Sequence, residues 1–174
     1  MSQLNERRLS MNWQQHLFGL AQQYSDVAQE IIGDNLVSVV LFGSIVRGEA
    51  HANSDIDLLI VCRQLPQGVF LRQAVLEPIR QQLQTELKRL WQEGYYIDFT
   101  EHLKNKEEAS QIRLLYLDMT EEAVILFDQD AFFANVLERL RTHLRQTGAQ
   151  RRKLGTLRYW DLKPDFRPGE VVTL

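Results

Sequence analysis

The sequence is poor in the residues that build disulfide and metal scaffolds. Its 174 residues include a single cysteine, Cys62, which excludes an intramolecular disulfide. Cys62 ends an apolar run and is interpreted as a core residue rather than a nucleophile. No group of cysteines and histidines has the spacing of a zinc site, and no local pattern indicates a Ser-His-Asp triad. The chemistry must therefore come from other side chains.

Long hydrophobic runs are also missing. No window approaches the roughly 20 consecutive apolar residues of a membrane span. The N-terminal stretch is polar and lacks the apolar centre of a signal peptide. We therefore expect a cytoplasmic protein that has no membrane partner.

Charge of one sign is concentrated in one part of the chain. The formal net charge is −3, which argues against a nucleic-acid binder that is basic throughout. Between Arg139 and Arg167, however, nine Lys/Arg face two Asp/Glu, a local charge of +7. This region is either a docking surface for phosphate or an acidic partner, or a solvated helix face and tail.

The apolar pattern predicts one domain with alternating helices and strands. A hydrophobic content of 44% suffices for a core, and periodicity indicates an α/β or α+β fold with a small mixed sheet flanked by helices. Predicted strands are residues 36–42, 56–62, 95–100 and 123–127; predicted helices are residues 10–32, 69–93, 105–118 and 130–146. Ser10 and Asp130 are expected as N-caps, and Gly33 and Gly148 as helix ends. Pro78 predicts a kink or a break.

Two regions carry alternative interpretations. The leucine-rich stripe of residues 71–90 is interpreted as core packing, with part of it open as a dimer surface of a homo-oligomer. Residues 151–174 contain Trp160 and two prolines, and are interpreted as an irregular tail packed on a domain of residues 1–150. The alternative for this tail is that its aromatic and basic side chains stack on bases and contact phosphates.

The segment of residues 41–61 carries the chemistry. A strand runs into Gly43 and Ser44, where a missing side chain and a hydroxyl would let phosphate approach the backbone. Arg47 follows one turn later; it is either a phosphate ligand or an exposed partner of Glu49. Asp55 and Asp57 lie on one face of the next strand, roughly 7 Å apart. Two such carboxylates are stable together mainly when cations lie between them, and hard oxygen ligands suit Mg²⁺.

A third carboxylate is expected from the following strand. Asp98 is the preferred candidate because a charged residue among apolar neighbours in a strand needs a reason; a buried salt bridge is the alternative. Glu101 is expected on the opposite face of that strand, and Asp118 near a helix end. His51 and His102 are interpreted as solvent-exposed loop residues, and the alternative for each is that it approaches the substrate.

This pattern resembles the nucleotidyltransferase superfamily that includes DNA polymerase β and kanamycin nucleotidyltransferase, and in particular its minimal prokaryotic members. Their signature is an apolar residue, Gly-Ser, about ten residues, and Asp-apolar-Asp before a strand. The present chain has Phe42-Gly43-Ser44, ten intervening residues and Asp55-Ile56-Asp57. The close match covers about 20 residues, and a looser one in element order extends to residue 147.

The resemblance implies the polymerase-β-type fold and a mechanism. Asp55, Asp57 and Asp98 would hold two Mg²⁺ ions, Gly43, Ser44 and Arg47 would contact the phosphates, and Asp98 would help to deprotonate an acceptor hydroxyl. The substrate would be ATP or another NTP, and pyrophosphate would leave.

The acceptor is not defined by these residues. The resemblance implies a protein, such as the small helical toxin of a toxin–antitoxin pair, or an RNA. An aminoglycoside is the weaker alternative, because an additional acceptor-binding domain would be expected. A non-catalytic module that binds nucleotide or neutralises a partner is the rival hypothesis, and nucleic-acid binding by the basic C-terminal region is a third.

Overall fold

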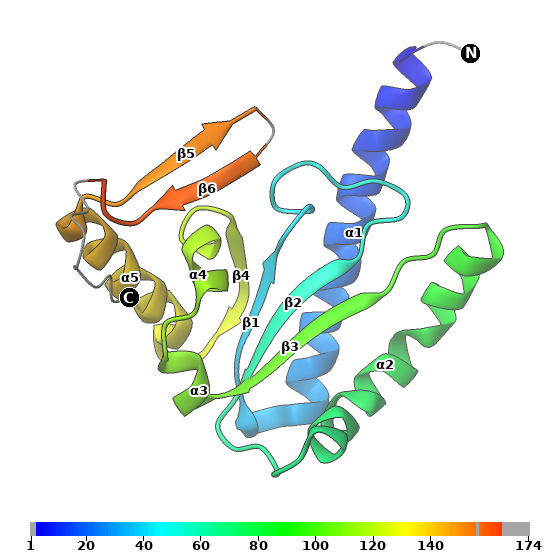
Figure 1. The fold of residues 1–174 in the computed structure, drawn as a ribbon. Helices are drawn as coiled ribbons and strands as arrows, with labels where there is room; N and C mark the ends of the chain where they lie inside the picture. Colours follow the sequence, from blue (N-terminus) through cyan, green and yellow to red (C-terminus); the bar gives the residue numbers. More distant parts are fainter. Residues whose placement is uncertain (1–2, 156, 165–174) are drawn as a thin grey trace.

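The computed structural model describes residues 3–155 and 157–164, and its centre is a four-stranded mixed sheet (Figure 1). The strand order is β3-β2-β1-β4, with β1 antiparallel to both of its neighbours and β2 parallel to β3. The strands are β1 (Leu36–Phe42), β2 (Ile56–Cys62), β3 (Phe99–Asn105), β4 (Ala123–Asp128), β5 (Gln150–Leu154) and β6 (Leu157–Asp161). The helices are α1 (Gln3–Ile32), α2 (Val69–Gln92), α3 (Lys106–Ser110), α4 (Leu114–Met119) and α5 (Phe132–Thr147), with short 3-10 turns η1 (Gly33–Asn35) and η2 (Gln129–Ala131). The predicted small mixed sheet flanked by helices is confirmed.

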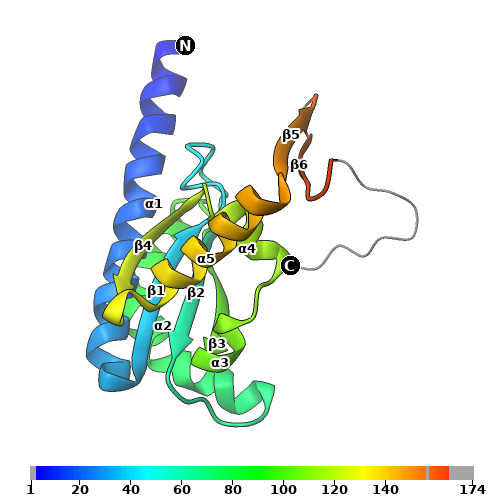
Figure 2. The same cartoon turned by 90° about the vertical axis from the view of Figure 1, so that its left-hand side faces the viewer.

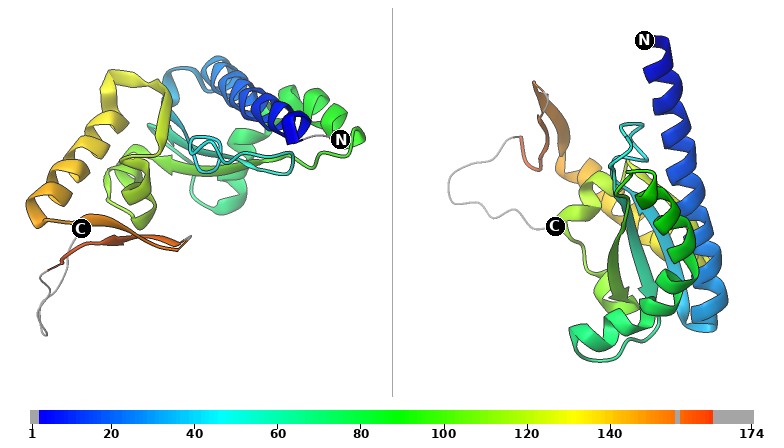
Figure 3. Two further views of the ribbon diagram at one scale, coloured as in Figure 1. Left: turned by 90° about the horizontal axis from the view of Figure 1, so that it is seen from above. Right: turned by 90° about the vertical axis from the view of Figure 1, so that its right-hand side faces the viewer.

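Helices cover both faces of the sheet, as the view from above shows (Figure 3). One face packs on α1 and α2 and buries alternate strand residues such as Leu58 and Ile60. The other face packs on α4 and α5 and buries the residues between them, such as Leu59 and Val61. Because both faces are covered, β1 is buried along its whole length, which explains its uninterrupted apolar run.

The strand order and directions bring four chain segments together at one end of the sheet. Since β1 runs antiparallel to β2 and β4, and β2 runs parallel to β3, the end of β1 meets the beginnings of the other three strands. Phe42, the last residue of β1, pairs with Asp57 on one side and Ala123 on the other. The segment that follows Phe42 therefore lies at the same end of the sheet as the segments that precede Ile56, Phe99 and Ala123.

Several predicted boundaries are wrong. The first helix begins at Gln3 rather than near Ser10, and residues 105–118 form two short helices instead of one. Asn105 begins the first of these through a reciprocal capping box with Glu108, which ends β3 sharply. The N-terminus of the last helix is capped by Asp128 rather than by Asp130. The Asp128 carboxylate accepts hydrogen bonds from the N–H groups of Phe133 and Ala134 at 3.0 and 2.9 Å.

The α2 helix and Cys62 follow the sequence more closely. The helix continues through Pro78 as one element, and its stripe from Ile79 to Leu90 faces the core. Leu71, by contrast, is exposed beside Phe70. Cys62 is fully buried, and burial raises the pKa of its thiol to about 11, in agreement with a core role.

The C-terminal region contains a hairpin that the sequence analysis did not predict. Gly148 ends α5 with φ +70°, and β5 begins almost at once, pairing with β6 so that Arg151 lies opposite Trp160. The hairpin lies at the same end of the molecule as the loop joining β1 and β2 (Figure 2). The predicted irregular tail of residues 151–174 is therefore wrong for the part that forms this hairpin, and its residues 156 and 165–174 lie outside the described residues. Within residues 3–155 and 157–164, no helix combines the length and apolar character that crossing a bilayer requires.

Candidate active site

Gly43 and Asp57 are in direct contact at the end of the sheet where β1 ends and β2 begins. Gly43 turns the chain out of β1 with φ +79°, a left-handed conformation that favours glycine. A Cβ placed on Gly43 would overlap Oδ2 of Asp57 and lie 3.0 Å from its Cγ. The two halves of the sequence motif therefore fit only because one of them has no side chain.

The residues after Gly43 form a chain of turns rather than a regular helix. The N–H of Arg47 donates to the carbonyl of Gly43 at 3.3 Å, and the N–H of Glu49 donates to the carbonyl of Ser44 at 2.9 Å. Ser44 is half-buried within this turn. The loop then closes on Ser54, whose hydroxyl accepts the N–H of His51 at 3.0 Å and leads the chain into Asp55.

Asp55 and Asp57 form a carboxylate pair at the start of β2. Asp57 is half-buried, whereas Asp55 is exposed just before the strand begins. Burial raises the pKa of Asp57, and the neighbouring Asp55 carboxylate raises it further, while His102 and Arg47 oppose the shift. Two close carboxylates, one of them half-buried, suit a hard divalent cation, so this donor set fits Mg²⁺ shared with phosphate oxygens.

Asp98 lies beside this pair, but not in the environment that the sequence suggested. It is exposed and directly precedes β3, instead of being surrounded by apolar residues inside a strand. Its carbonyl accepts the N–H of Ile56 at 2.9 Å, which extends the parallel register and places Asp98 alongside Asp55. Its carboxylate accepts the N–H of Phe99 at 2.8 Å. In the described part of the chain, no three His, Cys, Asp or Glu side chains are grouped closely enough to hold a metal ion.

Arg47 occupies the position next to the carboxylates and is itself paired. Its Nε donates to Glu49 at 2.7 Å, and its Nη1 lies 3.7 Å from Glu122. The pairing with Glu49 is the alternative that the sequence analysis left open. The guanidinium nevertheless lies near enough to offset a small part of the rise in the pKa of Asp57.

The weaker acidic candidates have other partners. Glu101 lies on the face of β3 that packs on α1 and α2, where the Tyr24 hydroxyl donates to it at 2.6 Å and Arg80 pairs with it. Burial and the Glu101 charge raise the pKa of Tyr24. Asp118 accepts the indole N–H of Trp160 at 3.0 Å.

Three residues near the site were not identified from the sequence. His102 belongs to β3 and is half-buried with its ring 5.5 Å from that of Phe42, so its interpretation as an exposed loop residue is wrong. The alternation of the strand that contains it could have placed it on the Asp57 face. Glu122 and Arg158 carry no local signal, because they reach the site from the turn before β4 and from the hairpin.

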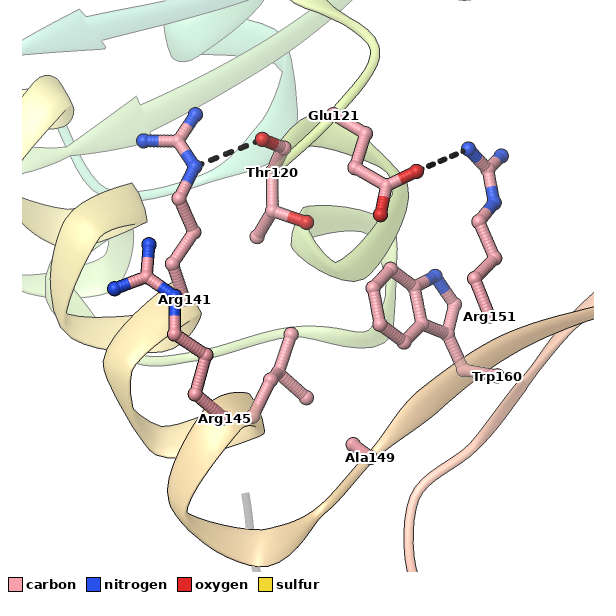
Figure 4. Close-up of a pocket in the computed structure, with 8 residues that line it drawn as sticks. Thr120, Glu121, Arg141, Arg145, Ala149, Arg151 and Trp160 are labelled. Atoms are coloured by element: carbon pink, nitrogen blue, oxygen red, sulfur yellow. Dashed lines mark hydrogen bonds and ion pairs between the residues drawn. The ribbon is translucent and has the colours of Figure 1, made fainter.

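The basic C-terminal region lines a separate cavity of about 290 Å³ between the end of α5, Thr120–Glu121 and the hairpin (Figure 4). Arg141 donates to the carbonyl of Thr120 at 2.8 Å, and Arg151 donates to Glu121 at 2.9 Å. These arginines therefore contact protein oxygens. Nucleic-acid binding by this region stays a prediction.

Comparison with known proteins identifies related chains. Residues 22–126 match the family model described as "Nucleotidyltransferase domain". A protein of Methanocaldococcus jannaschii named "Putative protein adenylyltransferase MJ1305" is 30% identical over 127 residues, which cover 72% of this chain and 81% of that protein.

Solved structures give weaker similarity. A chain in a crystal structure of a toxin–antitoxin with AMP-PNP matches at a TM-score of 0.45 and 15% identity, covering 74% of this chain and 92% of that chain. A chain in the complex of tri-AMPylated Shewanella oneidensis HEPN toxin with MNT antitoxin matches at a TM-score of 0.37 and 12% identity, covering 72% and 92% of the two chains.

Proposed function

Because this chain belongs to the nucleotidyltransferase domain family, we propose that it transfers AMP from ATP to an acceptor hydroxyl in a Mg²⁺-dependent reaction. The observation that carries the proposal is the half-buried Asp57, which has the Asp55 carboxylate beside it and contacts Gly43, a residue without a side chain. The pKa of Asp57 is raised by burial and by the neighbouring carboxylate, so its charge is costly for the folded protein unless a cation and phosphates use it.

Each residue of the site has a role in this proposal. Asp55 and Asp57 would hold two Mg²⁺ ions, with Asp98 as a further ligand once its carboxylate leaves the N–H of Phe99. When bound, these ions neutralise the triphosphate charge and stabilise the attacking and leaving oxygens. Gly43 lets the chain approach the phosphates closely, Ser44 offers its hydroxyl, and Arg47 offers a guanidinium to phosphate oxygens.

The bonds in the reaction balance as follows. The acceptor oxygen forms a bond to the α-phosphorus, and the bond from that phosphorus to the bridging oxygen of the β-phosphate breaks. Pyrophosphate leaves with the electron pair of that bond, and the acceptor proton passes to Asp98. Asp98 suits this role because it is exposed beside Asp55, where an acceptor can reach it.

The acceptor that we propose is a hydroxyl on a protein. The relative from Methanocaldococcus jannaschii, by its name, supports a protein acceptor. The resemblance to minimal nucleotidyltransferases further supports a small helical toxin as the partner of an antitoxin. RNA and aminoglycosides are the alternative acceptors.

The experiment is incubation with each α-³²P-labelled nucleoside triphosphate, Mg²⁺ and cell extract, for the wild type and for Asp57→Asn. We expect label from ATP on a band that protease removes and ribonuclease does not. A ribonuclease-sensitive band would instead make RNA the acceptor. Label on a small molecule, obtained when aminoglycosides are added, would favour antibiotic modification.

A second candidate function is that of a non-catalytic partner-binding module. Two observations favour it: Arg47 is paired with Glu49, and the Asp98 carboxylate is bonded to its neighbouring backbone. Partner binding and neutralisation that survive Asp55→Asn together with Asp57→Asn would support this function. Loss of neutralisation in that double variant, with partner binding retained, would support the enzyme.

A further inference from the structure

Four side chains at the edge of the candidate site form a closed ring of alternating charge. Glu49 bridges two arginines, with Oε2 accepting from Nε of Arg47 and Oε1 accepting from Nη2 of Arg158, both at 2.7 Å. Glu122 bridges the same two arginines, with Oε1 3.3 Å from Nη1 of Arg158 and Oε2 3.7 Å from Nη1 of Arg47. Arg158 therefore contacts both carboxylates that hold Arg47.

Glu122 is the more protected of the two carboxylates. Its side chain is 15% exposed, compared with 47% for Glu49, and it also pairs with Arg151. A carboxylate in such a position needs positive partners, since an unpaired charge there would be costly. Arg151 and Arg158 both come from the hairpin and provide these partners.

The hairpin that carries Arg158 is anchored independently of the ring. The indole N–H of Trp160 donates to Asp118 at 3.0 Å, and its ring packs against the core on the α4 and α5 side of the sheet. Arg151 reaches Glu121 on the same side, as Figure 4 shows. Arg158 is thus presented to the site from a fixed support.

We propose that Arg158 is a positioning residue for the triphosphate: through Glu49 and Glu122, it holds the Arg47 guanidinium beside Asp57. With Arg158 present, Glu49 has a second cation and Glu122 a third, so Arg47 can share its charge with a phosphate. Without Arg158, Arg47 would be the remaining cation in contact with Glu49, and the Glu49 carboxylate would compete with the phosphate for the Arg47 guanidinium. This inference rests on the proposed function, and Arg158 lies outside the residues matched by the family model.

The effect is expected in nucleotide affinity rather than in folding or chemistry. Arg158 is partly exposed, and exposed ion pairs contribute little to stability. Arg158→Ala should raise both the Kd for a non-hydrolysable ATP analogue with Mg²⁺ and the KM for ATP by about 3- to 30-fold, which lies within the range expected for coupled neighbours. The kcat should stay within about twofold of the wild-type value.

The matched control is Arg152→Ala. Arg152 is carried by the same hairpin, but it pairs with Asp161 at 2.9 Å within the hairpin and does not contact the ring. This variant should keep the wild-type KM. Arg158→Lys, which keeps one charge without the two-armed guanidinium, should recover part of the affinity.

A double-mutant cycle gives the decisive result. In the background of Arg47→Ala, Arg158→Ala should cause no further loss of affinity, because Arg158 acts through Arg47. An equal loss in both backgrounds, or a wild-type KM for Arg158→Ala, would overturn the positioning role. Failure of the wild-type protein itself to bind the Mg²⁺–nucleotide would instead overturn the proposed function, and this inference with it.

Discussion

The close approach of Gly43 to Asp57 makes Gly43→Ala the sharpest single test of the site. The new methyl group would overlap Oδ2 of Asp57, with Cγ 3.0 Å and Cβ 3.3 Å away, so the carboxylate and the turn must separate. An alanine at φ +79° also costs roughly 1–2 kcal/mol of folding free energy. A displacement of about 1 Å in a catalytic site lowers the rate on the order of 100-fold, equivalent to about 2.7 kcal/mol in the transition-state barrier.

The assay measures initial rates of nucleotide transfer at saturating ATP, together with thermal unfolding. Gly33→Ala is the matched control, because Gly33 has φ +58° and nothing within 4 Å of an added Cβ. Both variants should lose the stability that an alanine in the left-handed region costs, and Gly43→Ala should lose more because of its overlap with Asp57, but only Gly43→Ala should lose the activity. If Gly43→Ala transfers nucleotide within about threefold of the wild-type rate, the contact with Asp57 does not position the metal ligands and the reasoning fails.

Two further predictions concern buried charge. Asp57→Asn should raise the melting temperature of the metal-free protein at pH 7. The expected increase in the free energy of unfolding is roughly 0.5–2 kcal/mol. In the wild type, the pKa of the Asp57 carboxyl is raised in the folded state, so its protonated form favours folding at low pH and its ionised form disfavours folding as the pH rises. The stability gained by the substitution should therefore shrink toward a pH of about 4. An unchanged or lower melting temperature in scanning calorimetry would contradict this. Arg80→Leu should lower the free energy of unfolding, measured with urea, by about 3 kcal/mol, because the Glu101 side chain is only 3% exposed and would lose its cation. A loss below about 1 kcal/mol would show that the hydrogen bond from the Tyr24 hydroxyl is enough to stabilise the Glu101 carboxylate.

The sequence predicted the parts of the fold that are set by local apolar patterns. The ends of β1 and β2 agree with the structure because long Val/Leu/Ile runs end there at Gly43 and at polar residues. The contact between Gly43 and Asp57 was not predicted, because the sequence pattern assigned the missing side chain of Gly43 to a turn and to the approach of phosphate.

Other features depend on partners distant in the chain. Asp98 was placed inside a strand, but β3 starts after it because the pairing with β2 begins where Ile56 donates to the Asp98 carbonyl. The β5 strand is almost entirely polar and has no apolar alternation to reveal it. Arg158 and Glu49 are 109 residues apart, so only the folded chain brings them together.

The central claim is that Asp55 and Asp57 support transfer of the nucleotide rather than of the terminal phosphate. Its most direct test compares ATP labelled at the α-phosphate with ATP labelled at the γ-phosphate, with Mg²⁺, a candidate acceptor and either the wild type or Asp57→Asn. We predict that only the α-label reaches the acceptor, that transfer stops when Mg²⁺ is chelated, and that Asp57→Asn transfers none. Transfer of the γ-label, or α-label transfer that persists in Asp57→Asn, would contradict the account.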